Sequence, residues 1–126
     1  MKKIILILTL LILTACGKSL KDFETKEFIL SNLNNDYKIT LSFEGEKLYG
    51  FSGVNRYFGS FKLDGNKIEI SNLAMTKMAG PPEEMKAEQA YLDLLNKAVK
   101  FEILKDNLIL YTDNNEKLEF VLTKDK

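Results

Sequence analysis

The residues that could carry chemistry in this chain are few, and their types exclude most familiar enzyme mechanisms. Its 126 residues include one Cys and no His, which excludes a Ser-His-Asp triad, a Cys-His pair and an imidazole metal site. One Cys also excludes an intrachain disulfide. Eighteen basic side chains balance eighteen acidic ones, whereas a nucleic-acid-binding protein is expected to present a basic face. We therefore expect no catalytic residues, no metal or cofactor and no nucleic-acid partner.

Four polar residues in two short segments form the candidate face for a ligand or partner: Asn55, Arg56, Thr76 and Lys77. The Asn55 amide can bind a ligand from a loop; alternatively, it caps backbone groups left unpaired at a bend between Gly53 and Gly59. Arg56 and Lys77 can hold an anion such as a phosphate or carboxylate between them; alternatively, both are solvated surface cations. The sequence leaves these alternatives open.

Two other clusters have simpler explanations than a functional site. Three methionines could ligate a soft metal such as Cu(I), but no Cys or His accompanies them: Met75, Met78 and Met85. Three carboxylates could pair for glycoside hydrolysis, but acidic residues crowded at a helix start are explained by the helix dipole and by solubility: Glu83, Glu84 and Glu88.

The single cysteine lies directly after an apolar N-terminal segment. Lys2 and Lys3 precede Ile4 to Ala15, an uninterrupted run of apolar residues and Thr. As a helix the run would span roughly 18 Å against about 30 Å of hydrocarbon, so it is too short to cross a membrane and has the length of a secretory signal segment. Its end, Leu13-Thr14-Ala15-Cys16-Gly17, resembles the lipobox of bacterial lipoproteins, whose Cys is acylated and becomes the first residue of the mature chain. The alternative is a cleaved signal peptide followed by an incidental free Cys.

The lipobox resemblance divides the chain into three parts. We expect a lipoprotein signal peptide over residues 1–15, a lipidated Cys16 and polar tether over residues 16–25, and a folded domain over residues 26–126. Lipid on Cys16 would hold this domain at a membrane surface, in the cell envelope. Because Gly17 rather than Asp follows the Cys, the resemblance to lipoprotein sorting rules implies the outer membrane if the organism has one.

Most of the remaining chain alternates apolar and polar residues over short segments, which predicts half-buried β-strands. We expect seven or eight strands, antiparallel to their neighbours because the connections are short. They cover residues 26–33, 37–43, 47–51, 57–63, 67–70, 101–104, 107–112 and 117–123. Five aromatic residues at strand spacing could form a binding groove, but most are expected in the core: Tyr49, Phe51, Tyr57, Phe58 and Phe61.

One segment has a helical period instead. After Pro81-Pro82, apolar residues and one Glu recur at three- and four-residue steps, which predicts a helix from about Pro82 to Lys97. The expected buried face is Met85, Glu88, Leu92, Leu95 and Val99. The elements together predict a mainly β (α+β) domain, a compact curled antiparallel sheet or barrel-like structure with one covering helix.

Two ordered blocks of the chain carry a family resemblance. The first is Gly53-Val54-Asn55-Arg56-Tyr57-Phe58-Gly59-Ser60-Phe61, and the second is Ala74-Met75-Thr76-Lys77-Met78-Ala79-Gly80. They resemble the G-C-N-x-x-x-G-x-Y and A-x-T-[RK]-M-x-C blocks of the META domain family, also called HslJ-like. Glu88 with Tyr91-Leu92-Leu95 is similar to the family's helix, and Leu108-Ile109-Leu110 to its L-x-L strand. The resemblance covers about Thr25 to Leu122.

This chain departs from the family pattern at two positions. The family's two motif cysteines are replaced by Val54 and Gly80. Both thiols are absent together, as expected if they pair or share a role in other members. This chain can use neither position for a disulfide or for redox chemistry.

The resemblance implies a small envelope protein, often a lipoprotein, with a β-rich fold, an association with stress and no established catalytic activity. We therefore expect a lipid-anchored, non-enzymatic envelope protein that binds an unknown envelope protein or ligand, or supports the envelope under stress. The alternative is a lipoprotein inhibitor of a hydrolase such as a lysozyme or a protease, in which the segment from Lys77 to Pro82 would dock as a rigid loop.

Overall fold

The alternating segments of the sequence form strands of one sheet. Within residues 20–33 and 37–123, which the computed structural model describes, there are eight strands, one short 3-10 helix and one α-helix. In chain order they are η1 (Leu20–Phe23), β1 (Glu27–Leu30), β2 (Thr40–Glu44), β3 (Lys47–Phe51), β4 (Arg56–Asp64), β5 (Lys67–Met75), α2 (Pro82–Asn96), β6 (Ala98–Leu104), β7 (Asn107–Thr112) and β8 (Lys117–Leu122). The predicted mainly β domain with one covering helix is confirmed.

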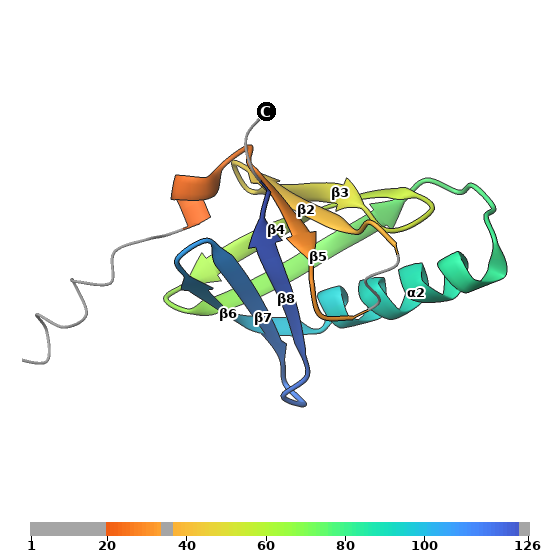
Figure 1. Cartoon of the computed structure of the whole chain (residues 1–126). Coiled ribbons are helices and arrows are strands. Elements are labelled where there is room, and N and C mark those ends of the chain that lie inside the picture. The colour runs from red at the N-terminus through yellow and green to blue at the C-terminus, as the bar shows by residue number, and fades with distance from the viewer. Residues whose placement is uncertain (1–19, 34–36, 124–126) are drawn as a thin grey trace, which may run out of the picture.

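The strands pair antiparallel in sequence order, and the pairing of β1 with β8 closes the sheet into a barrel (Figure 1). Alternate residues of each strand point into the barrel and fill it, as in other small barrels. Eight of these side chains are at most 1% exposed: Phe28, Leu41, Leu48, Tyr57, Leu108, Leu110, Leu118 and Phe120. The interior of the barrel is therefore a packed core, and any site for a partner lies on its surface or at its ends.

Strand β5 continues past the predicted end at Ile70 as far as Met75. Its register against β4 shifts between Phe58 and Ser60, and Asn72 adopts a positive φ of 57°. Such a bulge adds a residue to one strand and interrupts the alternation of apolar and polar side chains. The interrupted pattern explains why alternation alone predicts a shorter strand.

Helix α2 ends one residue before its predicted end, at Asn96, and packs against β5, β7 and β8. Its buried residues are Glu88, Tyr91 and Leu95. The predicted buried face is correct for Glu88 and Leu95, but it is wrong for Met85, which is 36% exposed, and for Val99, which lies in β6 and is 38% exposed. The buried stripe is narrower than predicted and is centred on Tyr91, because the helix touches the barrel along one line.

The polar tether predicted over residues 16–25 is too long at its C-terminal end. Leu20 and Phe23, both in η1, are each 3% exposed and belong to the core. The Phe23 ring packs edge-on against Phe28, with ring centroids 5.5 Å apart. The folded domain thus begins at Leu20 or earlier, because two apolar side chains in an otherwise charged segment are buried against the barrel.

The predicted signal peptide over residues 1–15 and the predicted lipidation site at Cys16 lie outside the described residues. Among the residues that are described, none belongs to a helix with the length and apolar character needed to cross a membrane.

Candidate functional site

The first block that carries the family resemblance is bonded to one buried carboxylate, that of Glu88 in α2. Its Oε1 accepts hydrogen bonds from Ser52 Oγ at 2.6 Å, Asn55 N at 2.7 Å and Val54 N at 3.2 Å. Its Oε2 accepts one from Asn55 Nδ2 at 2.9 Å. Glu88 is 2% exposed. Because both of its carboxylate oxygens accept hydrogen bonds from the loop between β3 and β4, Glu88 holds that loop against α2.

Asn55 connects Glu88 to the second block. Its Oδ1 accepts hydrogen bonds from Thr76 Oγ1 at 2.9 Å and from Met78 N at 2.7 Å, and its Nδ2 also donates to Met78 O at 3.2 Å. The Asn55 side chain therefore satisfies backbone groups of Met78, in a neighbouring segment, and not those of the bend between Gly53 and Gly59 that the sequence suggested. Glu88 accepts from the backbone of that bend instead, at Val54 N and Asn55 N. We call Ser52, Asn55, Thr76 and Glu88 the Asn55–Glu88 cluster.

The hydrogen bonds set the charge of the Glu88 carboxyl. Burial by itself would raise its pKa, but the donors Ser52 and Asn55, helped by the Val54 amide, lower the pKa below its ordinary value of 4.5. Glu88 is therefore ionised at neutral pH, in the form that accepts all four hydrogen bonds. A carboxylate held in this way acts as a structural clamp between α2 and the β3–β4 loop.

The two cations of the candidate face, Arg56 and Lys77, line different hollows of the surface. Arg56 and Lys77 are both exposed. Arg56 lines a groove on β1 to β4, whereas Lys77 lines a hollow between β5 and α2. The structure brings Asn55 and Thr76 together inside the cluster, but it does not bring Arg56 and Lys77 together around one hollow.

The positions of the two missing cysteines are in contact. A Cβ atom on Gly80 would lie 2.8 Å from one methyl carbon of Val54 and 3.5 Å from its Cβ. Disulfide-bonded residues have Cβ atoms about 3.5–4.5 Å apart. In this chain Val54 fills the space of the missing thiols, and Gly80 leaves room for its methyl groups.

A second buried polar pair joins α2 to the barrel and was not identified from the sequence. The hydroxyls of Tyr57 and Tyr91 are hydrogen bonded to each other, and Tyr57 also donates to Thr40 O. Burial raises the pKa of both phenols above the ordinary value of 10.0. Gly50 leaves space for this contact, since a Cβ there would lie 2.2 Å from Thr40 O. Tyr57 is in β4 and Tyr91 is in α2, so no local pattern in the sequence shows that these two tyrosines meet.

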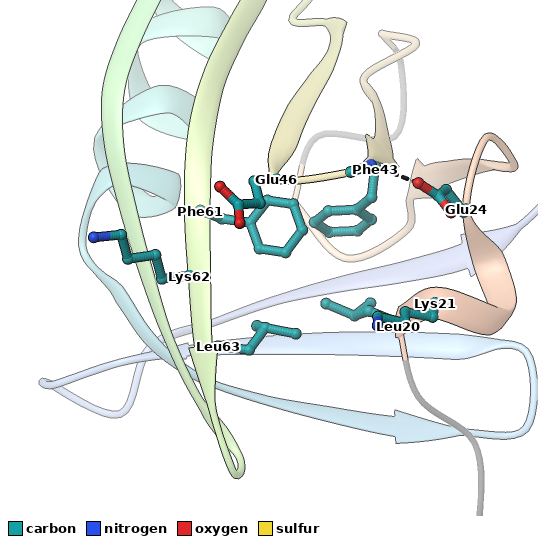
Figure 2. Close-up of a pocket in the computed structure, with 9 residues that line it drawn as sticks. Leu20, Lys21, Glu24, Phe43, Glu46, Phe61, Lys62 and Leu63 are labelled. Atoms are coloured by element: carbon teal, nitrogen blue, oxygen red, sulfur yellow. Dashed lines mark hydrogen bonds between the residues drawn. The ribbon is translucent and has the colours of Figure 1, made fainter.

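The barrel end that carries η1 has a hollow of about 420 Å³ (Figure 2). Leu20, Phe43, Phe61 and Leu63 supply its apolar lining. Four charged residues from η1, β4 and the adjoining turns also line it: Lys21, Glu24, Glu46 and Lys62. At one edge Glu24 accepts a hydrogen bond from the backbone N–H of Gly45, which ties η1 to the turn between β2 and β3. Sequence reasoning missed this hollow because it treated the segment before residue 26 as a tether.

Within residues 20–33 and 37–123, no group of three His, Cys, Asp or Glu side chains is placed to hold a metal ion. The carboxylates considered for glycoside hydrolysis do not share one environment. Glu88 is buried in the cluster, while Glu83 is exposed on α2. The polar groups that sequence reasoning singled out are thus used mainly to position loops.

Comparisons with known proteins agree with this architecture. The META domain profile matches residues 14–125. A solved structure of a protein from Burkholderia xenovorans is 25% identical, with a TM-score of 0.71 over 84% of this chain and 87% of that one. A DUF4847 family protein from Bacteroides vulgatus has the same fold at 12% identity, with a TM-score of 0.61 over 82% of this chain and 96% of its own. No curated protein matches the chain at a significant level.

Proposed function

The chain belongs to the META domain family, and this membership supports a bacterial envelope-type protein. On this basis we propose that it is a lipid-anchored, non-enzymatic binding protein of the cell envelope. In this proposal Cys16 carries the lipid and the signal peptide of residues 1–15 is removed. The barrel would then present its surface to an envelope protein or ligand, and its proposed work is to support the envelope under stress.

The observation that carries the proposal is the position of Cys16 relative to the fold. Cys16 lies four residues before Leu20, which is already buried in the core. Four residues span at most about 14 Å even when fully extended. Lipid on Cys16 would therefore keep the barrel end that carries η1 close to the membrane surface.

The candidate face would then point away from the membrane. In Figure 1 the connection between β5 and α2, which contains Thr76 and Lys77, lies at the opposite end of the barrel from η1. Lys77 and Met78 are exposed there, with Met78 at 61%. An anchored protein of this shape offers that end to partners in the adjoining compartment.

A non-enzymatic role is supported by how the buried polar groups are used. Both Glu88 oxygens and both polar atoms of the Asn55 amide are hydrogen bonded to protein groups. General acid–base catalysis needs a titratable group within hydrogen-bond reach of the substrate. The buried carboxylate of this cluster is instead enclosed at 2% exposure.

The anchor is tested by metabolic labelling with an alkyne analogue of palmitate, followed by membrane fractionation. We expect the label and the membrane association in the unmodified chain and their loss in Cys16→Ser. Arg56→Ala is the matched control and should behave like the unmodified chain. Equal labelling of Cys16→Ser, or an unmodified chain that fractionates away from membranes, would overturn the proposal.

The partner is sought by crosslinking in intact cells, comparing the unmodified chain with Cys16→Ser. A specific partner captured by the anchored form alone supports a membrane-proximal binding protein. If the anchored protein is abundant at the membrane and captures nothing above background, stable partnership is refuted.

Inhibition of a hydrolase is the second candidate function, and the loop before α2 favours it. Asn55 holds Met78 by both its N–H and its C=O, and Pro81-Pro82 follow. A loop fixed in this way loses little conformational entropy when it docks. If the protein is an inhibitor, it should inhibit a lysozyme or a protease at a one-to-one ratio, and Met78→Glu should abolish the inhibition while Lys62→Ala does not. No inhibition across both enzyme classes would exclude this function.

A further inference from the structure

The outer face of the first four strands carries a groove that neither the Asn55–Glu88 cluster nor the hollow of Figure 2 includes. It has a volume of about 370 Å³ and is lined by residues of β1 to β4 and by Lys38, just before β2. We propose that this groove binds an acidic oligosaccharide, that is, a chain of sugars carrying carboxylates. The inference rests on the envelope location proposed above and names the chemistry of the ligand.

Aromatic side chains are exposed at the groove and beside it. Tyr49 lines the groove and is 38% exposed, and Phe58 lies opposite it on β4 and is 49% exposed. Their strand neighbours Leu48 and Tyr57 fill the core, so Tyr49 and Phe58 point outward. Large aromatic rings usually contribute most when they are buried. Two of them left open and side by side offer flat apolar faces, which match the C–H face of a pyranose ring.

A free hydroxyl lies in the same groove. Ser42 is only 6% exposed, and its side chain makes no hydrogen bond to any other described residue. The adjacent outward residue of β2 contrasts with it, since Thr40 Oγ1 accepts a hydrogen bond from Phe51 N. Among the described residues no fully buried side-chain oxygen lacks a hydrogen-bond partner, so the Ser42 hydroxyl reaches the surface of the groove that it lines. It is therefore available to a ligand that brings its own polar groups, as a sugar does.

The charges at the groove favour an anion. Arg56 and Lys38 line it together with one carboxylate, that of Glu27. Within the described part of the chain none of the three makes an ion pair. The groove thus has one more cation than anions, and a guanidinium can bind a carboxylate through two parallel hydrogen bonds. A simple anion would use the cations but not the aromatic faces.

The topology disfavours an extended peptide that adds a strand. The barrel is closed, so β1 to β4 are paired on both sides and have no free edge for strand addition. A ligand of the groove must lie on the face of the sheet and use side chains. Aromatic faces, a hydroxyl and two cations on such a face suit a sugar chain with carboxylates.

The test is calorimetric titration of the full-length protein, purified in detergent, with tetrasaccharides of alginate, a polymer of uronic acids. Maltotetraose, inorganic phosphate and a proline-rich peptide are titrated in parallel. We expect alginate to bind, and Tyr49→Ala and Arg56→Ala to weaken its binding by about tenfold each. Ser42→Ala should weaken it by about fivefold, and Glu27→Gln should tighten it.

Two matched variants test whether loss of any exposed aromatic ring or any surface cation, rather than one in the groove, weakens binding. Tyr111→Ala removes an aromatic ring from β7 and Lys100→Ala removes a cation from β6, and both should leave alginate binding unchanged. The proposal is overturned by equal binding of maltotetraose, by displacement with phosphate alone, by binding that survives Tyr49→Ala, or by binding of the peptide alone. Titration with purified protein does not depend on lipid at Cys16, so failure of the anchor and failure of the groove are distinguishable.

Discussion

At the scale of single residues, Glu88 is the side chain that holds the first family block, and Asn55 links that block to the second. Its ionised carboxylate accepts hydrogen bonds from Ser52, Val54 and Asn55. Removing one partner of a buried hydrogen bond leaves the other unsatisfied, which costs more than the bond itself is worth. Glu88 should therefore contribute to stability far more than a surface carboxylate of the same helix.

We expect Glu88→Gln to lower the free energy of unfolding by about 1–3 kcal/mol at neutral pH, because the amide places a donor against other donors. The folded pKa of Glu88 is lowered from 4.5. Its contribution is therefore fully present above about that pH, and it declines as the pH falls below 4.5 through the folded pKa. Urea unfolding across this range should show the difference between the two proteins shrinking in acid.

Glu83→Gln is the control, since Glu83 is exposed on the same helix. It should change stability little at any pH. A Glu88→Gln protein as stable as the unmodified chain at neutral pH would show that the carboxylate is not a clamp.

The contact between Val54 and Gly80 predicts that the missing disulfide can be restored. In a Cys16→Ser background, Val54→Cys with Gly80→Cys should oxidise to an intrachain disulfide and stabilise the protein by about 2–4 kcal/mol. Mass spectrometry reports the loss of two hydrogens, and unfolding with and without reductant reports the stability. Persistent free thiols under oxidising conditions would show that the two backbones are farther apart than the contact indicates.

At the scale of elements, η1 belongs to the folded domain and not to a tether. Its two apolar residues pack in the core, although the segment around them is charged. η1 is also tied to the β2–β3 turn through Glu24 and Gly45. The 3-10 helix is therefore fixed against one end of the barrel.

Leu20→Ala should destabilise the protein by about 2–5 kcal/mol, the usual range for a buried Leu that leaves a cavity. The neighbouring Lys21→Ala should have little effect, because Lys21 is exposed. Thermal unfolding of both variants checks the prediction. If the two variants unfold alike, residues 20–23 act as part of the tether.

At the scale of the whole molecule, the function proposed above would make one end of the closed barrel an anchor end and the opposite end a presenting end. The hollow of Figure 2 and η1 lie at the first, and the connection between β5 and α2 lies at the second (Figure 1). The barrel is filled with side chains and has no room for a ligand inside. It serves to hold its two ends at a fixed separation. If Cys16 carries lipid as proposed, the short chain between Cys16 and Leu20 would set the orientation of the barrel at the membrane.

This orientation can be measured with the lipidated protein in vesicles that contain nitroxide-labelled lipid. A fluorophore on Lys62→Cys, at the anchor end, should be quenched more strongly than one on Lys77→Cys, at the presenting end. The same two variants without vesicles supply the control for local quenching. Equal quenching at both positions would contradict the proposed orientation.

The sequence by itself determined the class of fold and most element boundaries. Strands β3 and β7 match the expected ranges, and α2 ends within one residue of its expected end. These features depend on alternation, helical period, prolines and turn residues, which are local properties of the chain. The family blocks were also readable locally, and they singled out Asn55 and Thr76, which the structure shows to be hydrogen bonded to each other.

Only the tertiary structure decided what those residues contact. Glu88 lies 33 residues from Asn55, and Val54 lies far from Gly80 in sequence, so neither contact leaves a local signal. Alternation shows that Tyr49 and Phe58 lie on the opposite face of the sheet from Leu48 and Tyr57. Only closure of the barrel determines which of the two faces is buried. Burial, hydrogen-bond partners and the exposed groove depend on long-range pairing, and that pairing exists only once the chain is folded.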